Sequence, residues 1–180
     1  MQKRGLQRRL SPFNFFGQRQ EFFKPERRAE MKPLESISVV RVELVKDRRS
    51  HYSAIKVEHP EELVEVLKKF LGKADREVFL AVNLGTRHEI NSIHVVSMGS
   101  ILSAIVHPRE VFKAAILSNA YTIALAHNHP SGDAQPSEED LKITARLAEA
   151  GKILDIKILD HIIIAGDKYL SFAEQHIGGF

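Results

Sequence analysis

The sequence predicts a mixed α/β or α+β domain in which one β-sheet is flanked by helices. Apolar runs of strand length, rich in β-branched residues, recur between residues 37 and 172. Segments with a helical period lie between them, and each of these segments opens on a proline. A chain of 180 residues that is 43% hydrophobic and 27% charged has the size and composition of one globular domain with a buried core.

The first half of the pattern predicts four strands and one helix. Residues 37–45, ISVVRVELV, and 52–57, YSAIKV, have the alternation and composition of strands. Pro60 suits the first position of a helix, and an apolar stripe continues from it to Gly72, which ends the helix. Residues 77–85, EVFLAVNLG, form a nearly continuous apolar strand that residues 88–99 join as a hairpin.

The second half predicts two helices and three strands. A helix is expected from Arg109 to Ser118, and a buried strand follows over residues 121–129, YTIALAHNH. Residues 155–172 form two further strands around a Gly166–Asp167 turn. Residues 136–151 have the clearest helical pattern, with an expected apolar face formed by Leu141, Thr144, Ala145, Leu147 and Ala148.

The composition excludes several classes of protein. No apolar run approaches the roughly 18–20 residues of a membrane-spanning helix, and the basic N-terminus lacks the apolar segment of a secretory signal. The chain has no cysteine, which excludes disulfides, thiolate zinc ligands and a cysteine nucleophile. We therefore expect a cytoplasmic protein that does not contact a membrane.

Residues 1–35 differ in charge from the rest of the chain. They hold nine Lys and Arg against four Glu, whereas residues 36–180 hold 17 Lys and Arg against 19 acidic residues. Five of the ten phenylalanines lie among these basic residues, and no strand or helix period persists there. We expect a flexible, basic, Phe-rich arm over residues 1–35 and one domain over residues 36–180. The alternative is an arm that contacts DNA through phosphate binding and base stacking.

Residues 125–141, LAHNHPSGDAQPSEEDL, contain the residue types of a metal site. His127 and His129 are two apart at the end of an expected strand, so both imidazoles lie on one face of it. Asp140 falls in the first turn of the next helix, and the turn-forming residues between can bring that helix start back to the strand end. Two imidazoles and a carboxylate suit a tetrahedral Zn²⁺ with one position open for a water of lowered pKa.

A reaction at such a site also needs groups that handle protons and charge. Glu77, at the head of an apolar strand, is the candidate acceptor of the water's proton, with Glu89 and Glu110 as rivals. Ser137 can stabilise a developing oxyanion. Taken one at a time, these residues also have purely structural explanations. Ser137 and Asp140 resemble a capping box, and the histidines can be hydrogen-bonded at a strand end.

Other catalytic motifs do not match. The ligand motifs of zinc deaminases, the H-E-x-x-H motif of zinc proteases and the G-x-S-x-G motif of serine hydrolases are absent. The contiguous His-Asn-His is no evidence for an HNH nuclease, whose three residues are dispersed over a larger finger.

The spacing His-x-His, seven residues, Ser, two residues, Asp resembles the pattern of JAMM (MPN+, JAB) metalloproteases without departure. The Pro-Ser-Gly after His129, the preceding HPREVFKAAILSNA and the following LDHIIIAG and YLSFAE resemble the RadC branch of that superfamily. This resemblance runs from about Glu77 to Glu174 and is strongest over residues 107–140, within a motif-bearing core of about residues 77–176. It implies a JAMM-type fold, a curved mixed sheet between helices that is similar to cytidine deaminase.

The resemblance assigns roles to the residues of the site. It implies that Glu77 is the general acid/base and that Ser137 assists the tetrahedral intermediate. The implied ligands of a single zinc ion are His127, His129 and Asp140.

Two more histidines, His107 and His161, lie in stretches that match the RadC branch. Each either lines the cleft or supports the ligands, or is a packed histidine with a backbone partner. Longer RadC proteins resemble a fusion of a helix-hairpin-helix DNA-binding module to the JAMM domain. The Gly-x-Gly hairpins of such a module are absent before Glu77, so the usual basis for binding duplex DNA is missing.

Three functions remain as hypotheses. The first is a zinc-dependent hydrolase of peptide or isopeptide bonds, acting on a peptide or protein. The second is a DNA-associated accessory or scaffold protein in repair or recombination, which the basic arm would support. The third is a metal-dependent nuclease, which is disfavoured because one zinc without an acidic second-metal cluster suits acyl substrates better. The sequence does not name the substrate or the oligomeric state.

Overall fold

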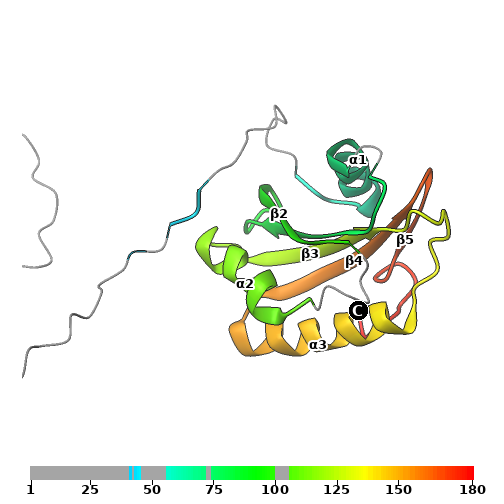
Figure 1. The fold of residues 1–180 in the computed structure, drawn as a ribbon. Coiled ribbons are helices and arrows are strands. Elements are labelled where there is room, and N and C mark those ends of the chain that lie inside the picture. The colour runs from blue at the N-terminus through cyan, green and yellow to red at the C-terminus, as the bar shows by residue number, and fades with distance from the viewer. Residues whose placement is uncertain (1–40, 42, 46–55, 72–73, 100–105) are drawn as a thin grey trace, which may run out of the picture. The chain divides into compact units, whose positions relative to one another are not determined.

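The computed structural model describes residues 41, 43–45, 56–71, 74–99 and 106–180 (Figure 1). All of these except Arg41 belong to one compact unit, Val42–Phe180. The expected arm, residues 1–35, lies outside the described residues, and its flexibility stays a prediction. Most of the strands expected over 37–45 and 52–57 also lie outside them. Of their described residues, 41 and 43–45 are in no strand, and Lys56 makes a single antiparallel bridge to Glu89.

The described part of the unit is a mixed sheet with helices, which confirms the predicted fold class. Its strand order is β2-β1-β3-β4-β5. β1 is antiparallel to both β2 and β3, β3 is parallel to β4, and β4 is antiparallel to β5. In chain order the elements are α1 (Pro60–Leu71), β1 (Val78–Leu84), β2 (Ile90–Met98), α2 (Pro108–Leu117), β3 (Thr122–Asn128), α3 (Glu138–Leu154), β4 (Lys157–Ala165) and β5 (Lys168–Ser171).

Helices cover both faces of the sheet (Figure 1). On one face, α1 packs its buried leucines and Val64 against alternate residues of β1, β3 and β4. On the other face, α2 and α3 pack against the intervening residues of the strands, of which Phe79 and Leu125 are fully buried. Strands buried on both sides read as continuous apolar runs, which explains the sequences of β1 and β3.

The helix boundaries follow local signals. α1 begins at Pro60, and the Glu62 carboxylate accepts the backbone N–H groups of Glu58 and His59 just before it. Gly72, expected to end this helix, lies outside the described residues. α2 begins at Pro108, one residue before the predicted start. None of the helices in the described ranges is long and apolar enough to cross a lipid bilayer.

The predicted apolar face of α3 is partly wrong. Leu141 is 37% exposed and Ala145 is exposed, whereas the buried face consists of Asp140, Thr144, Leu147 and Gly151. Gly151 is buried because the backbone of Ile156 approaches it closely, so that a Cβ would lie 2.5 Å from the Ile156 carbonyl oxygen. An apolar pattern misses this face because half of it is a carboxylate and a glycine.

Candidate metal centre

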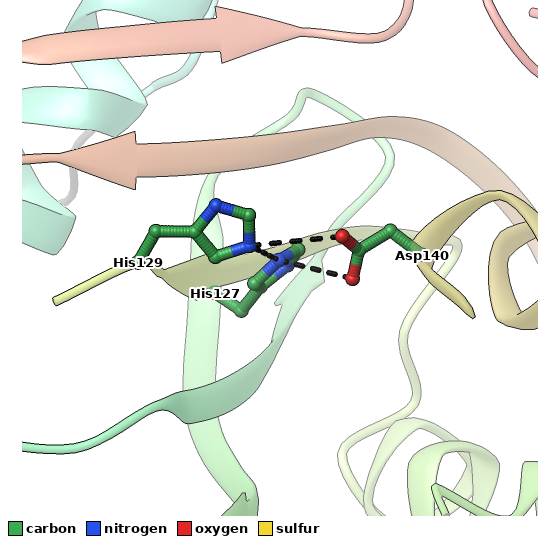
Figure 2. A group of neighbouring side chains, drawn as sticks. All are labelled: His127, His129 and Asp140. Carbon is green, nitrogen blue, oxygen red and sulfur yellow. Dashed lines mark hydrogen bonds and ion pairs between the residues drawn. The ribbon is translucent and has the colours of Figure 1, made fainter. Parts of the chain in front are cut away.

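Three side chains from the end of β3 and the start of α3 point toward one another (Figure 2). The Nε2 atoms of His127 and His129 lie 2.9 Å apart. Asp140 Oδ1 lies 3.2 Å from His127 Nε2, and Asp140 Oδ2 lies 3.6 Å from His129 Nε2. One possible ligand atom from each residue lies within 4.8 Å of the other two. The sequence-predicted ligands are therefore brought together.

The connection between β3 and α3 sets this geometry. β3 and β4 are parallel, so the chain must cross over through α3, whose first turn lies beside the carboxyl end of β3. Ser137 is the N-cap of α3, and its Oγ accepts the Asp140 N–H at 3.2 Å. Asp140 Oδ2 in turn accepts the Ser137 N–H at 2.8 Å and the Ser137 hydroxyl at 2.7 Å. The capping box thus orients the carboxylate.

The hydrogen bonds around the site leave lone pairs available on atoms that could bind a metal. His129 Nδ1 lies 2.7 Å from the backbone carbonyl oxygen of Asp133, which only accepts, so Nδ1 carries the proton and Nε2 is a lone pair. Asp140 Oδ1 is buried and accepts no hydrogen bond. Its polar neighbour is His127 Nε2 at 3.2 Å, and a buried carboxylate oxygen that accepts no hydrogen bond is costly. A cation between these atoms satisfies it, so the residues fit a metal.

Charge interactions couple the carboxylate to the imidazoles. Burial by itself would raise the pKa of Asp140, but the rings of His127 and His129 hold it well below its ordinary value. The pKa of His129 is raised, first by its contact with Asp140, against the opposing effect of burial, with smaller contributions from the Asp133 carbonyl and the Glu77 charge. The carboxylate is therefore ionised at neutral pH, as a metal ligand must be.

Glu77 directly precedes β1 and lies beside His129. The β1–β3 register ends at the pair Phe79 and His127, two residues from both Glu77 and His129, and the charge of Glu77 contributes to the raised pKa of His129. The Asn128 amide holds the backbone on either side of Glu77, because its Oδ1 accepts the Val78 N–H at 2.8 Å and its Nδ2 donates to the Arg76 carbonyl at 2.9 Å. Sequence reasoning missed Asn128, since no local pattern relates two segments 50 residues apart.

The structure also describes three other residues that the sequence singled out. Glu89 follows the opposite end of β1, where its carboxylate accepts the Arg87 N–H. Glu110 lies in the first turn of α2 and pairs with Arg109 at 3.2 Å. His107 is the N-cap residue of α2, and its side chain does not cap the helix. None of the three contributes an atom to the metal-ligating group.

His161 in β4 supports His127 from behind. Its Nε2 lies 2.8 Å from His127 Nδ1, and its Nδ1 lies 2.6 Å from the hydroxyl oxygen of Thr144. His161 is fully buried, and burial lowers its pKa well below the ordinary value. The sequence singled out His161, but it did not reveal the hydroxyl of Thr144, which was expected on an apolar face.

A groove of about 690 Å³ lies beside the outer edge of the site. It is lined by residues 132–135, by residues 167–171 and by Glu174 and Gln175. Asp133, whose carbonyl oxygen binds His129, is part of this lining. The groove is therefore connected to His129 through Asp133, and the three metal-ligating residues are not part of its lining.

Residues 57–177 match the family model of the RadC-like JAB domain. The chain belongs to this family. This RadC-like JAB domain is 47% identical over 119 residues to a UPF0758 protein of Caldanaerobacter subterraneus, covering 66% of this chain and 51% of that protein. It is 43% identical over 121 residues to a UPF0758 protein of Desulfitobacterium hafniense, covering 67% and 53%, and 41% identical over 120 residues to one of Methanosarcina mazei, covering 67% and 52%. The chain thus spans about half the length of these relatives.

Proposed function

We propose that this RadC-like JAB domain is a zinc-dependent hydrolase of peptide or isopeptide bonds. The donor set supports this most directly. Two imidazoles and one buried carboxylate converge, and Asp140 Oδ1 accepts no hydrogen bond. Three protein ligands with a fourth position left open are typical of catalytic zinc sites. A zinc ion held there would supply Lewis acidity and would lower the pKa of a water towards neutrality.

Glu77 is the group that moves the proton in this proposal. Its carboxylate takes a proton from the attacking water and gives it to the leaving amine nitrogen. The partly buried position beside His129 supports this role, as does the influence of its charge on the pKa of His129. Asn128 restrains the peptide groups on both sides of Glu77, so the carboxylate starts from a defined position.

Ser137 contributes first by orienting Asp140. Its hydroxyl hydrogen is committed to Asp140 Oδ2 at 2.7 Å. A bond from Ser137 to a developing oxyanion therefore requires this hydroxyl to rotate away from the carboxylate. We propose this second role as the catalytic contribution of Ser137.

Metal analysis of the purified full chain tests the site. We expect about one zinc per chain, the stoichiometry of a site with three protein ligands. The double variant His127→Ala, His129→Ala should lose the metal and keep its secondary structure. A protein without zinc, or a double variant with unchanged zinc, would contradict the proposal.

Substrate profiling with peptide and isopeptide libraries tests the reaction. Glu77→Gln should lower turnover by about 10²–10⁴-fold, the usual contribution of a general acid/base. Glu89→Gln is the matched control, because it removes a carboxylate at the other end of β1, and it should retain activity. If both variants lost turnover equally, Glu77 would not be the general acid/base. Glu77-dependent cleavage of DNA but not of peptides would favour the nuclease instead.

DNA contact through residues 1–35 stays a prediction from the sequence. Deletion of these residues should abolish salt-sensitive DNA binding. Binding that persists without them, or that is absent from the full chain, would remove the support for a DNA-associated role.

A further inference from the structure

The groove beside the metal centre contributes no ligand and no proton carrier to the proposed hydrolysis. Its lining includes every residue of β5 (Lys168–Ser171). Successive side chains of a strand point to opposite faces of the sheet, so a single groove does not collect the side chains of four consecutive residues. What consecutive strand residues share is their backbone edge. The groove therefore runs along the edge of β5.

This edge of β5 is not paired with another strand of the described sheet. β5 is the last strand in the order, and it pairs with β4 alone (Figure 1). Residues of an antiparallel strand alternate between those that hydrogen-bond to the neighbouring strand and those that do not. The Phe172 N–H donates to the His161 carbonyl in β4 at 3.0 Å, so alternation turns the backbone groups of Tyr169 and Ser171 outward.

The available part of the edge is centred on Tyr169. Neither its N–H nor its carbonyl oxygen has a backbone partner in the part of the chain that the structure describes. The carbonyl oxygens on either side are occupied. That of Asp167 accepts Lys68 Nζ at 2.8 Å, and that of Ser171 accepts the Gln175 N–H at 3.2 Å. One donor and one acceptor of Tyr169 therefore face the groove together, as the pairing of an added strand requires.

A buried carboxylate holds the end of this edge in place. Asp160 in β4 is buried, and its Oδ2 accepts the Ser171 hydroxyl at 2.6 Å. Its Oδ1 accepts the N–H groups of His161 and Ala173 at 2.7 and 2.9 Å. The Ser171 Oγ in turn accepts the Glu174 N–H at 3.1 Å. The wall of the groove after β5 is therefore preformed, as is usual for ligand-binding sites.

The groove is acidic. Asp133, Asp167 and Glu174 are exposed carboxylates of its lining, and Lys168 is the one basic residue among the described residues that line it. Carboxylates on a surface attract basic groups and repel acidic ones. The charge of the lining therefore favours a segment that contains Lys or Arg.

Charged neighbours outside the lining do not cancel this excess. Lys68 of α1 reaches the Asp167 carbonyl, and the Glu61 carboxylate of α1 accepts the Tyr169 hydroxyl at 3.1 Å. These two side chains add one charge of each sign. Burial first, and then the hydrogen bond to Glu61 and the charge of Glu174, raise the pKa of Tyr169 to about 12. This direction is the one that negative surroundings impose on a phenol.

The edge lies at a defined distance from the metal centre. His129 continues β3, because its N–H donates to the Ile164 carbonyl oxygen at 2.8 Å, and Ile164 pairs with Tyr169. Tyr169 is therefore level with His129 and two strands away from it. Adjacent strands lie about 4.8 Å apart, so a strand added outside β5 lies about 14 Å from His129, a distance that about four extended residues span.

We propose that the groove binds an extended, Lys- or Arg-containing segment of the polypeptide substrate as an added strand on β5, about four residues from the cleaved bond. This inference rests on the proposed function in so far as it takes a polypeptide as the substrate. The backbone of the segment accepts the Tyr169 N–H and donates to the Tyr169 carbonyl oxygen, as peptides that bind by strand addition do. Its basic side chains meet the carboxylates of the lining.

Peptide binding to the chelator-treated full chain tests the backbone pairing. The probe is a fluorescently labelled octapeptide in which lysine and threonine alternate, and fluorescence anisotropy reports its binding. Tyr169→Pro removes the outward N–H and is compatible with an edge strand, whereas Tyr169→Ala loses the same ring and keeps the N–H. Tyr169→Pro should bind about tenfold more weakly than Tyr169→Ala, the effect of one hydrogen bond. Equal affinities of the two folded variants would overturn the strand addition.

Modified probes test the same pairing without a change to the protein. One octapeptide is N-methylated at its lysines and another at its threonines, so that each has lost the backbone donors of one edge. At least one of them should bind the unmodified chain about tenfold more weakly than the parent probe. Unchanged binding of both would overturn the strand addition even if Tyr169→Pro does not fold.

A pair of double variants tests the charge of the groove. Asp167→Asn with Glu174→Gln removes two carboxylates of the lining. Glu149→Gln with Asp155→Asn is the matched control, because it removes two exposed carboxylates of α3 and its C-cap. The groove variant should lose about 3–10-fold of the preference for the lysine probe over its glutamate counterpart, the effect of two exposed ion pairs. The same preference in both double variants would overturn the assignment of a basic segment.

A second copy of the chain is the other strand that could occupy this edge. In that case the full chain would form a dimer in analytical ultracentrifugation, and Tyr169→Pro would abolish it while Tyr169→Ala would not. This result would overturn the binding of a substrate segment. A sedimentation coefficient that is the same in both variants is the outcome we expect.

The failure of the groove and the failure of the proposed function are distinguishable. Binding of the probe is measured in chelator-treated protein, so it requires neither zinc nor turnover. A chain that binds the probe at Tyr169, but neither holds zinc nor hydrolyses a peptide, would support the groove and contradict the proposed function. A chain that hydrolyses long basic peptides with the same kcat/KM in Tyr169→Pro and Tyr169→Ala would contradict the groove alone.

Discussion

His127 and His129 lie two residues apart on the chain, but different parts of the molecule hold them. His127 is fully buried, and its inner nitrogen meets the side chain of His161 and, through it, Thr144. The side chain of His129 is 12% exposed, and its outer nitrogen donates to a backbone carbonyl in the loop after β3. We call these the inner side and the outer side of the site.

The two sides impose different demands on the sequence. The inner side depends on the hydrogen-bonding groups of particular side chains from three elements, which an apolar side chain of the same shape does not supply. The outer side depends on a peptide carbonyl, which every residue supplies. The outer side also adjoins the groove. The contacts of His127 are thus set by side chains in the core, whereas His129 is held by the backbone of a surface loop.

The largest effect on the inner side is expected from Phe79→Ala. Loss of the ring that packs on both His127 and His161 should lower the free energy of unfolding by about 3–5 kcal/mol and weaken zinc binding. Phe112→Ala is the matched control, because Phe112 is equally buried on the same face of the sheet. It should cost similar stability in chemical denaturation without changing zinc affinity. Equal zinc affinities in the two variants would show that the ring does not support the ligands.

Asn128→Ala tests whether the backbone around Glu77 must be held. Removal of the amide leaves the Val78 N–H and the Arg76 carbonyl without their partner, which should cost about 1–3 kcal/mol in unfolding free energy. Turnover should fall while zinc content is unchanged, because Glu77 is displaced and the ligands are not. A variant with normal turnover would show that the position of Glu77 is set by other contacts.

The pH dependence of stability should have opposite signs on the two sides in the chelator-treated protein. Burial lowers the pKa of His161 below 6.5, so the unfolded chain binds a proton that the folded chain does not. Stability then falls as the pH drops below 6.5, by at most about 1.4 kcal/mol per pH unit. The pKa of His129 is raised, chiefly by Asp140, so its contribution is present below 6.5 and is lost as the pH rises through the raised value.

Denaturation at several pH values can separate these contributions. His161→Gln should remove the loss of stability in acid and leave the opposite trend of His129. His129→Gln should do the reverse. The same slope in both variants would mean that other groups dominate the titration.

The smallest effect is expected from Asp133→Ala on the outer side. The carbonyl that holds His129 remains, and only the exposed side-chain bond to the Gln135 N–H is lost. The unfolding free energy should change by no more than about 1 kcal/mol, and zinc affinity should match that of the unmodified protein. Zinc binding as weak as in Phe79→Ala would contradict the difference between the two sides.

Much of the fold could be predicted from the sequence, because the patterns that indicate helices, strands and turns involve neighbouring residues. The strand runs from residue 77 onward, the Gly166–Asp167 turn and the capping box of Ser137 and Asp140 are all defined by neighbouring residues, and the structure contains each of them. The order of strands in the sheet depends on packing between distant segments, so it was not predicted.

The residues of the site that belong to one short motif of fixed spacing could be predicted from the sequence. The residues that act through contacts between distant segments could not. His127, His129 and Asp140 follow one short motif, and they converge. The amide of Asn128 acts on a segment about 50 residues earlier, and Thr144 was read as part of an apolar face. Hydrophobic periodicity predicts only that a threonine faces inward. It does not predict that the hydroxyl has a hydrogen-bond partner there.

His127, His129 and Asp140 come from one stretch of chain, from β3 to the first turn of α3, whereas Glu77 precedes β1. The metal-ligating group is therefore encoded separately from the proposed proton carrier. Under the proposed function, a change at Glu77 alone would leave the His-x-His and Ser-x-x-Asp spacing intact and remove only the proton transfer. The spacing by itself thus indicates a metal-ligating group and not an enzyme.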